Sequence, residues 1–333
     1  MSTKYVRFNY FEPQLVPAED LFRAEIQNEG GVEEVFADDI PADRWEMQQV
    51  LDYFMVERAL DTSVEVGDEF AEIEPESIFY RQNHDYYFFQ VTKLRDSNIP
   101  AKKRMNRIKE DIRLEQDEYI GEFVSILYDN AYGVVAMQSN LYGVSSKQAE
   151  VVLTNLRQMY LYENDIDEEI PLVVRLVPII DNEQINKAVR SDYYKKVRIK
   201  GSDYMMDANV GYGDDLLSEA ARLVNRVQGV HFDITFSLGR SEKTASLDEE
   251  NIRELIERYQ MIGEEVKPKV ELTSLENEDA QIETVNLLEP RMTDRFTINV
   301  APRTTVGHEH LIDEFVHKSF NNRRPDIRRV MRP

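Results

Sequence analysis

The side chains best placed to do chemistry lie near the C-terminus, in the segment HEHLIDEFVH. His310, Glu314 and His317 are spaced i, i+4 and i+7, so on a helix they would lie on one face. Two imidazoles and a carboxylate are ligands that zinc accepts, and the spacing therefore permits a metal site. The alternative is an exposed face on which these groups pair locally, because Leu311 and Phe315 already supply a buried stripe. Since the order is not HExxH, we expect no bound metal and no other cofactor.

A second kind of chemistry would be metal-dependent cleavage of nucleic acid, which needs carboxylates and a lysine at a sheet edge. Asp233 in FDITF, Glu271 in KVEL and the nearby Lys269 supply these residue types. The pattern is weak, because a chain with 63 acidic residues has carboxylates beside many strands by chance. The sequence also lacks a phosphate loop, a GxSxG elbow and the kinase motifs. A metal-dependent nuclease or hydrolase is therefore the alternative to a non-enzymatic protein.

The distribution of charge indicates where a partner could bind. A net charge of −23 opposes a duplex-DNA surface spread over the whole protein. Basic residues nevertheless gather in three islands, which are the candidate contacts to nucleic acid or to an acidic partner. The islands comprise Lys102, Lys103, Arg104 and Arg107; Lys195 and Lys196; and Arg323, Arg324, Arg328 and Arg329. A protein whose acidic bulk mimics DNA is a third possibility, but the sequence shows no face of regularly spaced carboxylates.

The third island forms a basic tail with the sequence NNRRPDIRRVMRP. Pro325 opposes continuation of a helix, so we expect residues 321–333 to form an extended, mobile arm with hydrated guanidinium groups. The arm could contact phosphates, or it could lie along the acidic surface of its own chain. Both interpretations stay open on the sequence alone.

The elements that must position these groups begin with antiparallel strands and two helices. Apolar residues on either side of the turn-rich segment 129–133 predict a hairpin over 123–137. Ser145 and Gln148 have capping-box spacing at the start of a helix that reaches Met159. A second helix is predicted within 41–60. Further strands are predicted at 5–11, where Pro13 should end the strand, and at 78–81 and 86–93.

An acidic run over 163–169 is the best candidate for a domain boundary, because its five carboxylates repel one another and supply no core side chain. We expect an N-terminal α+β region over 1–165, a C-terminal α/β region over 166–320 and the basic tail over 321–333. The predicted C-terminal strands are 172–179, 194–199, 230–238, 269–272, 281–287 and 296–300, and the predicted helices are 214–227, 246–259 and 306–320. The fold class is therefore α+β, with mixed, largely antiparallel sheets on which amphipathic helices pack.

The segments KYVRFNYF, FFQVTKLRD and DEYIGE, followed by LYD, QSN and GVS, resemble an uncharacterised family of bacterial and prophage proteins. The resemblance spans most of the chain and transfers no catalytic residue. Its occurrence in prophages implies a role in conflict between phage and host. We therefore expect a non-enzymatic binding or assembly subunit of an antiphage-defence system, homo-oligomeric, with protein partners from the same defence operon and with nucleic acid as a further candidate partner.

The most apolar window, 170–180, is interrupted by Arg175 and is shorter than the roughly 18 residues that a membrane span requires. The N-terminus lacks the apolar core of a signal peptide, and the chain contains no Cys. These features predict a cytoplasmic protein without membrane insertion.

Overall fold

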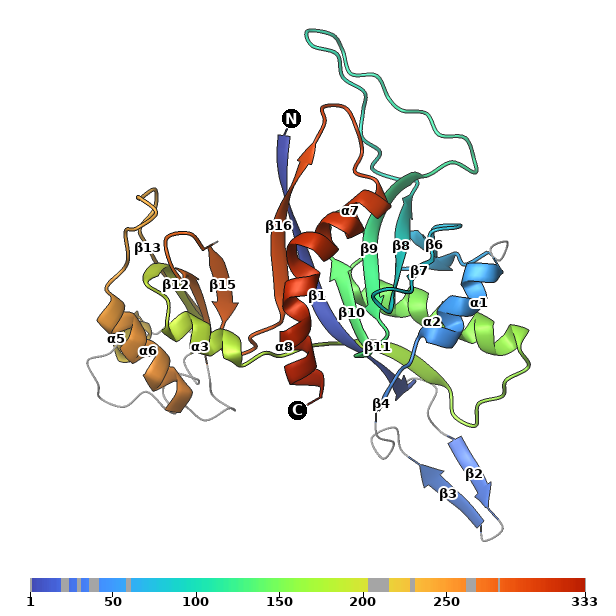
Figure 1. Cartoon of the computed structure of the whole chain (residues 1–333), viewed down its shortest axis with the longest axis horizontal. Helices are drawn as coiled ribbons and strands as arrows, with labels where there is room; N and C mark the ends of the chain where they lie inside the picture. Colours follow the sequence, from blue (N-terminus) through green and yellow to red (C-terminus); the bar gives the residue numbers. More distant parts are fainter. Residues whose placement is uncertain are drawn as a thin grey trace. The chain divides into compact units, whose positions relative to one another are not determined.

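The computed structural model describes residues 2–18, 24–28, 31–35, 42–57, 61–202, 216–227, 231–261, 268–280 and 282–332. The chain divides into two units, one formed by Met1–Ile179 with Met292–Pro333 and the other by Ile180–Arg291. Each unit combines helices with antiparallel strands, which confirms the α+β class (Figure 1). In the part of the chain that is described, no helix is long and apolar enough to cross a membrane.

The first unit is built on a large sheet in which β1 is the longest strand. The strands run in the order β11-β1-β10-β9-β8-β6-β5, while β16 and β4 also pair with β1 and β7 pairs with β8. Their bounds are β1 Ser2–Pro17, β4 Asp43–Arg44, β5 Val64–Glu65, β6 Phe70–Ile73, β7 Phe79–Arg81, β8 Tyr86–Arg95, β9 Ile120–Asp129, β10 Val134–Gln138, β11 Leu172–Pro178 and β16 Thr293–Val300. A separate hairpin joins β2 (Ala24–Asn28) to β3 (Gly31–Val35).

Helices cover both faces of this sheet. On one face, α1 (Gln48–Val56) and α2 (Ser146–Glu163) share a core with alternate residues of β9, such as Val124 and Ile126. On the other face, Leu127 packs with α7 (His308–Phe315), which continues as the π-helix η4 (Val316–Phe320) and then as α8 (Asn321–Met331). Because successive strand residues point to opposite faces, a strand buried on both sides must be apolar at consecutive positions. This explains the consecutive apolar and aromatic residues of β8, as in YYFF, and of β9, as in ILY.

The hairpin and the capped helix predicted in the middle of the chain are confirmed. β9 and β10 pair from Val134 opposite Asp129 to Met137 opposite Ile126. Gly133 lies in their connecting turn at a φ of +62°, a conformation that side chains with a Cβ rarely adopt. At the start of α2, both hydrogen bonds of the predicted capping box are present.

The prediction that Pro13 ends the first strand is wrong, since β1 continues to Pro17. Pro13 pairs with Leu176 of β11, and its carbonyl accepts a hydrogen bond from Trp45 N–H on the opposite edge of the strand. The missing N–H of Pro13 therefore faces an edge on which β10 has already ended, at Val135 opposite Phe11. Beyond β10 this edge pairs only with the two-residue strand β4, so the proline costs at most the one hydrogen bond that a residue 13 N–H would donate opposite Trp45.

The second unit is a small sheet with the strand order β13-β12-β14-β15. Its elements are α3 Glu183–Val189, β12 Tyr193–Ser202, α5 Leu216–Val227, β13 His231–Ser237, α6 Glu249–Met261, β14 Lys269–Leu275 and β15 Glu283–Asn286. Leu255 and Ile256 of α6 pack against Val197 and Ile199 of β12. The helix predicted after Ser246 is confirmed, although Asp248 accepts the hydrogen bond from Asn251 N–H at its start, while Ser246 accepts one from Tyr194 N–H.

The division into units differs from the boundary expected at 165/166. The acidic run over 163–169 is exposed, but β11 beyond it pairs with β1 in the large sheet, and β16 returns to the same strand. A run of like charges indicates a solvated connection, whereas the units are decided by strand pairing between residues far apart in the sequence. The long insertion between β11 and β16 forms the second unit.

Candidate functional site

The segment between β8 and β9 carries the first basic island on a projecting loop. The last ladder pair is Arg95 opposite Ile120, and the loop over 96–119 extends beyond the strands of the large sheet (Figure 1, teal). Within it, Lys102 and Glu110 exchange two backbone hydrogen bonds of 2.8 Å, and Arg107 N–H donates to the carbonyl of Arg104. These bonds form a small secondary hairpin whose turn presents the basic side chains to solvent.

The charges of this hairpin are available to a partner. Residues 101–113 are all exposed and include six basic and two acidic residues. Among the residues that the structure describes, no carboxylate lies within ion-pair distance of Lys102, Lys103, Arg104 or Arg107; Lys103 Nζ donates instead to the carbonyl of Arg107. Met105 and Ile108 on the same turn are 91% and 87% exposed. The loop therefore combines unneutralised cations with two accessible apolar side chains.

The second island lies on β12 and is largely occupied within its own unit. Lys195 Nζ donates to the carbonyls of Glu242, at 3.0 Å, and Ala245. Lys196 is half-buried on the same strand. Neighbouring Arg198 forms two hydrogen bonds to Asp233, at 2.8 and 2.6 Å.

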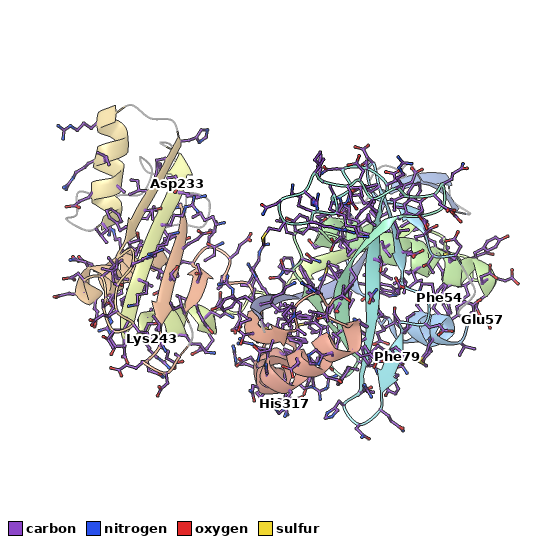
Figure 2. The ribbon with its side chains drawn as sticks, turned by 90° about the horizontal axis from the view of Figure 1, so that it is seen from above. Phe54, Glu57, Phe79, Asp233, Lys243 and His317 are labelled. Carbon is purple, nitrogen blue, oxygen red and sulfur yellow. The ribbon has the colours of Figure 1, made fainter. Side chains whose placement is uncertain are left out.

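The three residues considered for a nuclease are brought together on the same small sheet. Asp233, which is labelled in Figure 2, forms ion pairs with Arg198 and Lys200. The hydrogen bond with Arg198 is the main reason why the pKa of Asp233 falls to about 2. Lys269 Nζ lies 3.1 Å from Glu271, which Arg198 approaches to 3.9 Å from the other side. Both carboxylates are therefore engaged by cations of the chain itself, in a cross-strand ladder of alternating charge.

The third island does not form the extended arm expected from Pro325, because Asn321–Met331 is helical as α8. Arg323 lies 2.6 Å from Asp294, which also accepts a 2.6 Å hydrogen bond from Tyr10. Arg324 lies 3.0 Å from Asp129, whose side chain is fully buried. These bonds to buried carboxylates, together with burial of Ile327, offset the backbone hydrogen bond that Pro325 cannot make. Of the two interpretations, the structure supports the intramolecular one for Arg323 and Arg324.

The two remaining arginines of the third island, Arg328 and Arg329, are on the outer side of α8. Arg329 lies 3.6 Å from Asp326, and Arg328 is exposed. They therefore remain solvent-facing, although the helix that carries them is fixed to the sheet by its other face.

The three residues considered as metal ligands are near one another but differently engaged. Glu314 forms an ion pair with Lys318, and the bond to Lys318 lowers its pKa, with smaller contributions from His310 and His317. The change from α7 to η4 at Val316 alters the helical phase before His317, so the i, i+7 relation of an α-helix does not hold. Among the described residues, no group of three or more His, Asp or Glu side chains is arranged to hold a metal ion.

His317, which is labelled in Figure 2, instead contributes to a polar pocket between the β7–β8 hairpin and the helical segment. The pocket has a volume of about 650 Å³ and is lined also by Arg81, His84, Asp313 and Asn321. Arg81 lies 3.7 Å from Asp313 across it. The opposite charges of Arg81 and Asp313 therefore offset each other within the pocket.

A buried Ser–His contact is the feature that the sequence patterns did not indicate. Ser125 Oγ lies 2.8 Å from His308 Nδ1, and the His308 ring contacts Phe88 and Phe123. Burial lowers the pKa of His308 to about 4, so the imidazole is neutral at pH 7. Ser125 is fully buried, which keeps its hydroxyl away from any substrate in solution. The contact is a structural one within the core.

Comparison with models of protein families gives a match over nearly the whole chain. The model of the family of unknown function DUF6731 matches residues 1–327. No curated protein matches the chain.

Proposed function

Since the chain belongs to DUF6731, a family of unknown function, we propose its function from its own side chains. It is a non-enzymatic binding or assembly subunit of a bacterial or prophage antiphage-defence system. It contacts nucleic acid through the loop over 96–119. The observation that carries this proposal is the exposed hairpin of the loop, whose Lys102, Lys103, Arg104 and Arg107 meet no carboxylate of the described chain. In the other two islands, most basic groups bind carboxylates or carbonyls of the chain itself.

The chemistry of the loop suits a polyanion. Each lysine or arginine that neutralises a phosphate releases condensed counterions, which favours binding and makes it dependent on salt. The excess of cations is confined to the exposed hairpin of the loop, residues 101–113, whose six basic residues outnumber its two acidic ones and can be approached by phosphates from solvent. Met105 and Ile108 are exposed between these cations and can contact bases or sugars.

The proposal also covers the location of the protein and its partners. We place the protein in the cytoplasm, as a homo-oligomer that associates with protein partners encoded in the same defence operon. The alternative function is that of a metal-dependent nuclease or hydrolase of such a system. The ion pairs of Asp233 and Glu271 argue against these two carboxylates as ligands of a catalytic metal ion. Such an ion would have to displace Arg198, Lys200 and Lys269.

Replacement of Lys102, Lys103, Arg104 and Arg107 by Gln should weaken nucleic-acid binding at least about tenfold at 0.1 M salt. The slope of log affinity against log salt should fall by about 3 for a single strand, since each phosphate contact contributes roughly 0.7. Fluorescence anisotropy with a labelled oligonucleotide across a salt series measures both quantities.

The matched control replaces four exposed basic residues outside the three islands by Gln, namely Arg226, Arg240, Lys243 and Arg303. It makes the same change in net charge and should leave the slope nearly unchanged. Equal slopes for the two quadruple variants would reject the loop as the contact. Cleavage of plasmid DNA with magnesium or manganese by the purified protein would support the nuclease alternative instead.

A further inference from the structure

The two arms of the exposed hairpin between β8 and β9 are joined by hydrogen bonds at its base and at its tip. Lys102 and Glu110 exchange two backbone bonds at the base, and Arg107 N–H donates to the Arg104 carbonyl at 3.2 Å across the tip. Lys103 Nζ adds a bond to the carbonyl of Arg107. The tip therefore has a defined turn before any partner binds.

The four residues of this turn are Arg104, Met105, Asn106 and Arg107, and all of them are exposed. Asn106 has a φ of +57°, in the left-handed region that asparagine tolerates better than most residues. The Met105 side chain beside it is 91% exposed. The centre of the turn thus presents an aliphatic side chain and a carboxamide, with a guanidinium group on either side.

The hairpin is long enough for its turn to reach the floor of a DNA groove. Met105 lies three residues beyond Lys102, which forms the bridge with Glu110 at the base of the hairpin. At roughly 3.3 Å per extended residue these three residues span roughly 10 Å, whereas the minor groove of B-DNA is about 7.5 Å deep. The bridge can therefore stay outside the groove while Met105 contacts base pairs.

The residue types of the turn distinguish among anionic partners. Proteins that bind the minor groove read it with Arg, Lys, Asn or Gln, and they insert aliphatic side chains such as Met between base steps. Binding of single strands relies on aromatic side chains on which bases stack, and residues 101–113 contain no Phe, Tyr or Trp. Insertion of Met105 into a bilayer would carry Asn106 toward the hydrocarbon, where its amide would lose hydrogen bonds to water. The turn therefore suits duplex DNA best.

Cations lie on both arms of the hairpin, as the two phosphate backbones that border a groove require. Lys102, Lys103 and Arg104 precede the centre of the turn, and Arg107, Lys109 and Arg113 follow it. Among the residues that the structure describes, none of the six has a carboxylate within ion-pair distance. Each arm can therefore neutralise phosphates of one strand.

We propose that the hairpin enters the minor groove of duplex DNA and that Met105 inserts between two base pairs and kinks the duplex. This inference rests on the proposed nucleic-acid contact of the loop and specifies its target. Asn106 contacts base edges, while Arg104 and Arg107 contact the groove and its phosphates on either side. Unstacking of one base step is the energetic cost, and the kink brings more of the duplex against the cations.

The test uses a duplex of about 20 base pairs with a central TA step, which kinks easily, and with a fluorescent donor and acceptor at its two ends. Wild type should bind it more tightly than the single strand of the same sequence. Binding should raise the transfer efficiency between the dyes by the amount that a bend of at least about 20° produces. Met105→Ala should bind with the same salt slope, because it removes no cation, and should leave the efficiency unchanged.

Leu141→Ala is the matched control, because Leu141 is 89% exposed and lies outside the loop. This variant should bend the duplex as wild type does. Neither alanine substitution should change the melting temperature, since both side chains are exposed.

Equal transfer efficiencies for the free and the bound duplex would overturn the inference, as would a bend that Met105→Ala retains. Tighter binding to the single strand would also overturn it, and so would binding to vesicles of anionic phospholipid without binding to the duplex. In each case the proposed function stands if the four Gln substitutions in the loop still lower the salt slope for a single strand. The two failures are therefore distinguishable.

Discussion

Arg324→Met should lower the free energy of unfolding by about 3 kcal/mol at pH 7, since it removes one partner of an ion pair whose other member is buried. Arg324 Nε and one terminal nitrogen lie 3.0 and 3.1 Å from the two oxygens of Asp129. The Asp129 side chain is inaccessible to solvent, whereas that of Arg324 is 26% exposed. The substitution keeps a long side chain on α8 and leaves the carboxylate without its cation.

The loss should depend on pH with a defined sign. Burial raises the pKa of Asp129, and Arg324 opposes that rise, so the pKa of Asp129 should increase further in the variant. A carboxyl group whose pKa is higher in the folded state binds more protons there, and the fold becomes relatively more stable as pH falls. The difference between wild type and Arg324→Met should therefore shrink from pH 7 to pH 5.

Arg328→Met is the matched control, because Arg328 lies on the same helix and is exposed. It should change the free energy of unfolding by less than about 0.5 kcal/mol. Urea titrations of the three proteins at both pH values measure these differences. Equal losses in the two variants would show that α8 is not held through Asp129.

Acidification from pH 7 to pH 5 should cost the fold about 2 kcal/mol through His308 alone. Burial lowers the pKa of His308 to about 4, while the unfolded value is about 6.5. The unfolded state therefore takes up the proton first as pH falls. The contribution is fully present above the unfolded pKa and is lost as pH falls from there toward the folded pKa.

A comparison of wild type with His308→Gln isolates this contribution. Glutamine retains a polar group near Ser125 but does not titrate, so the variant should lose less stability than wild type between pH 7 and pH 5. His310→Gln, at an exposed position of the same helix, should behave like wild type. Parallel stability curves for wild type and His308→Gln, from denaturant titrations at half-unit pH steps, would contradict the assignment.

Local patterns were sufficient to predict most helices and strands of the chain. The β9–β10 hairpin follows from the turn chemistry before Gly133, and the start of α2 follows from Ser145 and Gln148. The π-helical turn before α8 is a local feature that the patterns missed, because Val316–Phe320 reads as ordinary amphipathic helix. The successes share a cause, since each depends on residues within a few positions of one another.

The sequence by itself therefore determined most of the secondary structure, the α+β class and the positions of the three basic islands, but not the helical state of the tail. Only the tertiary structure decided which island is free. Asp129 pairs with Arg324 at a separation of 195 residues, while the hairpin turn near Arg104 meets no carboxylate among the described residues. Charge pairing and strand pairing between distant segments depend on the folded arrangement, and no local spacing in the sequence encodes them.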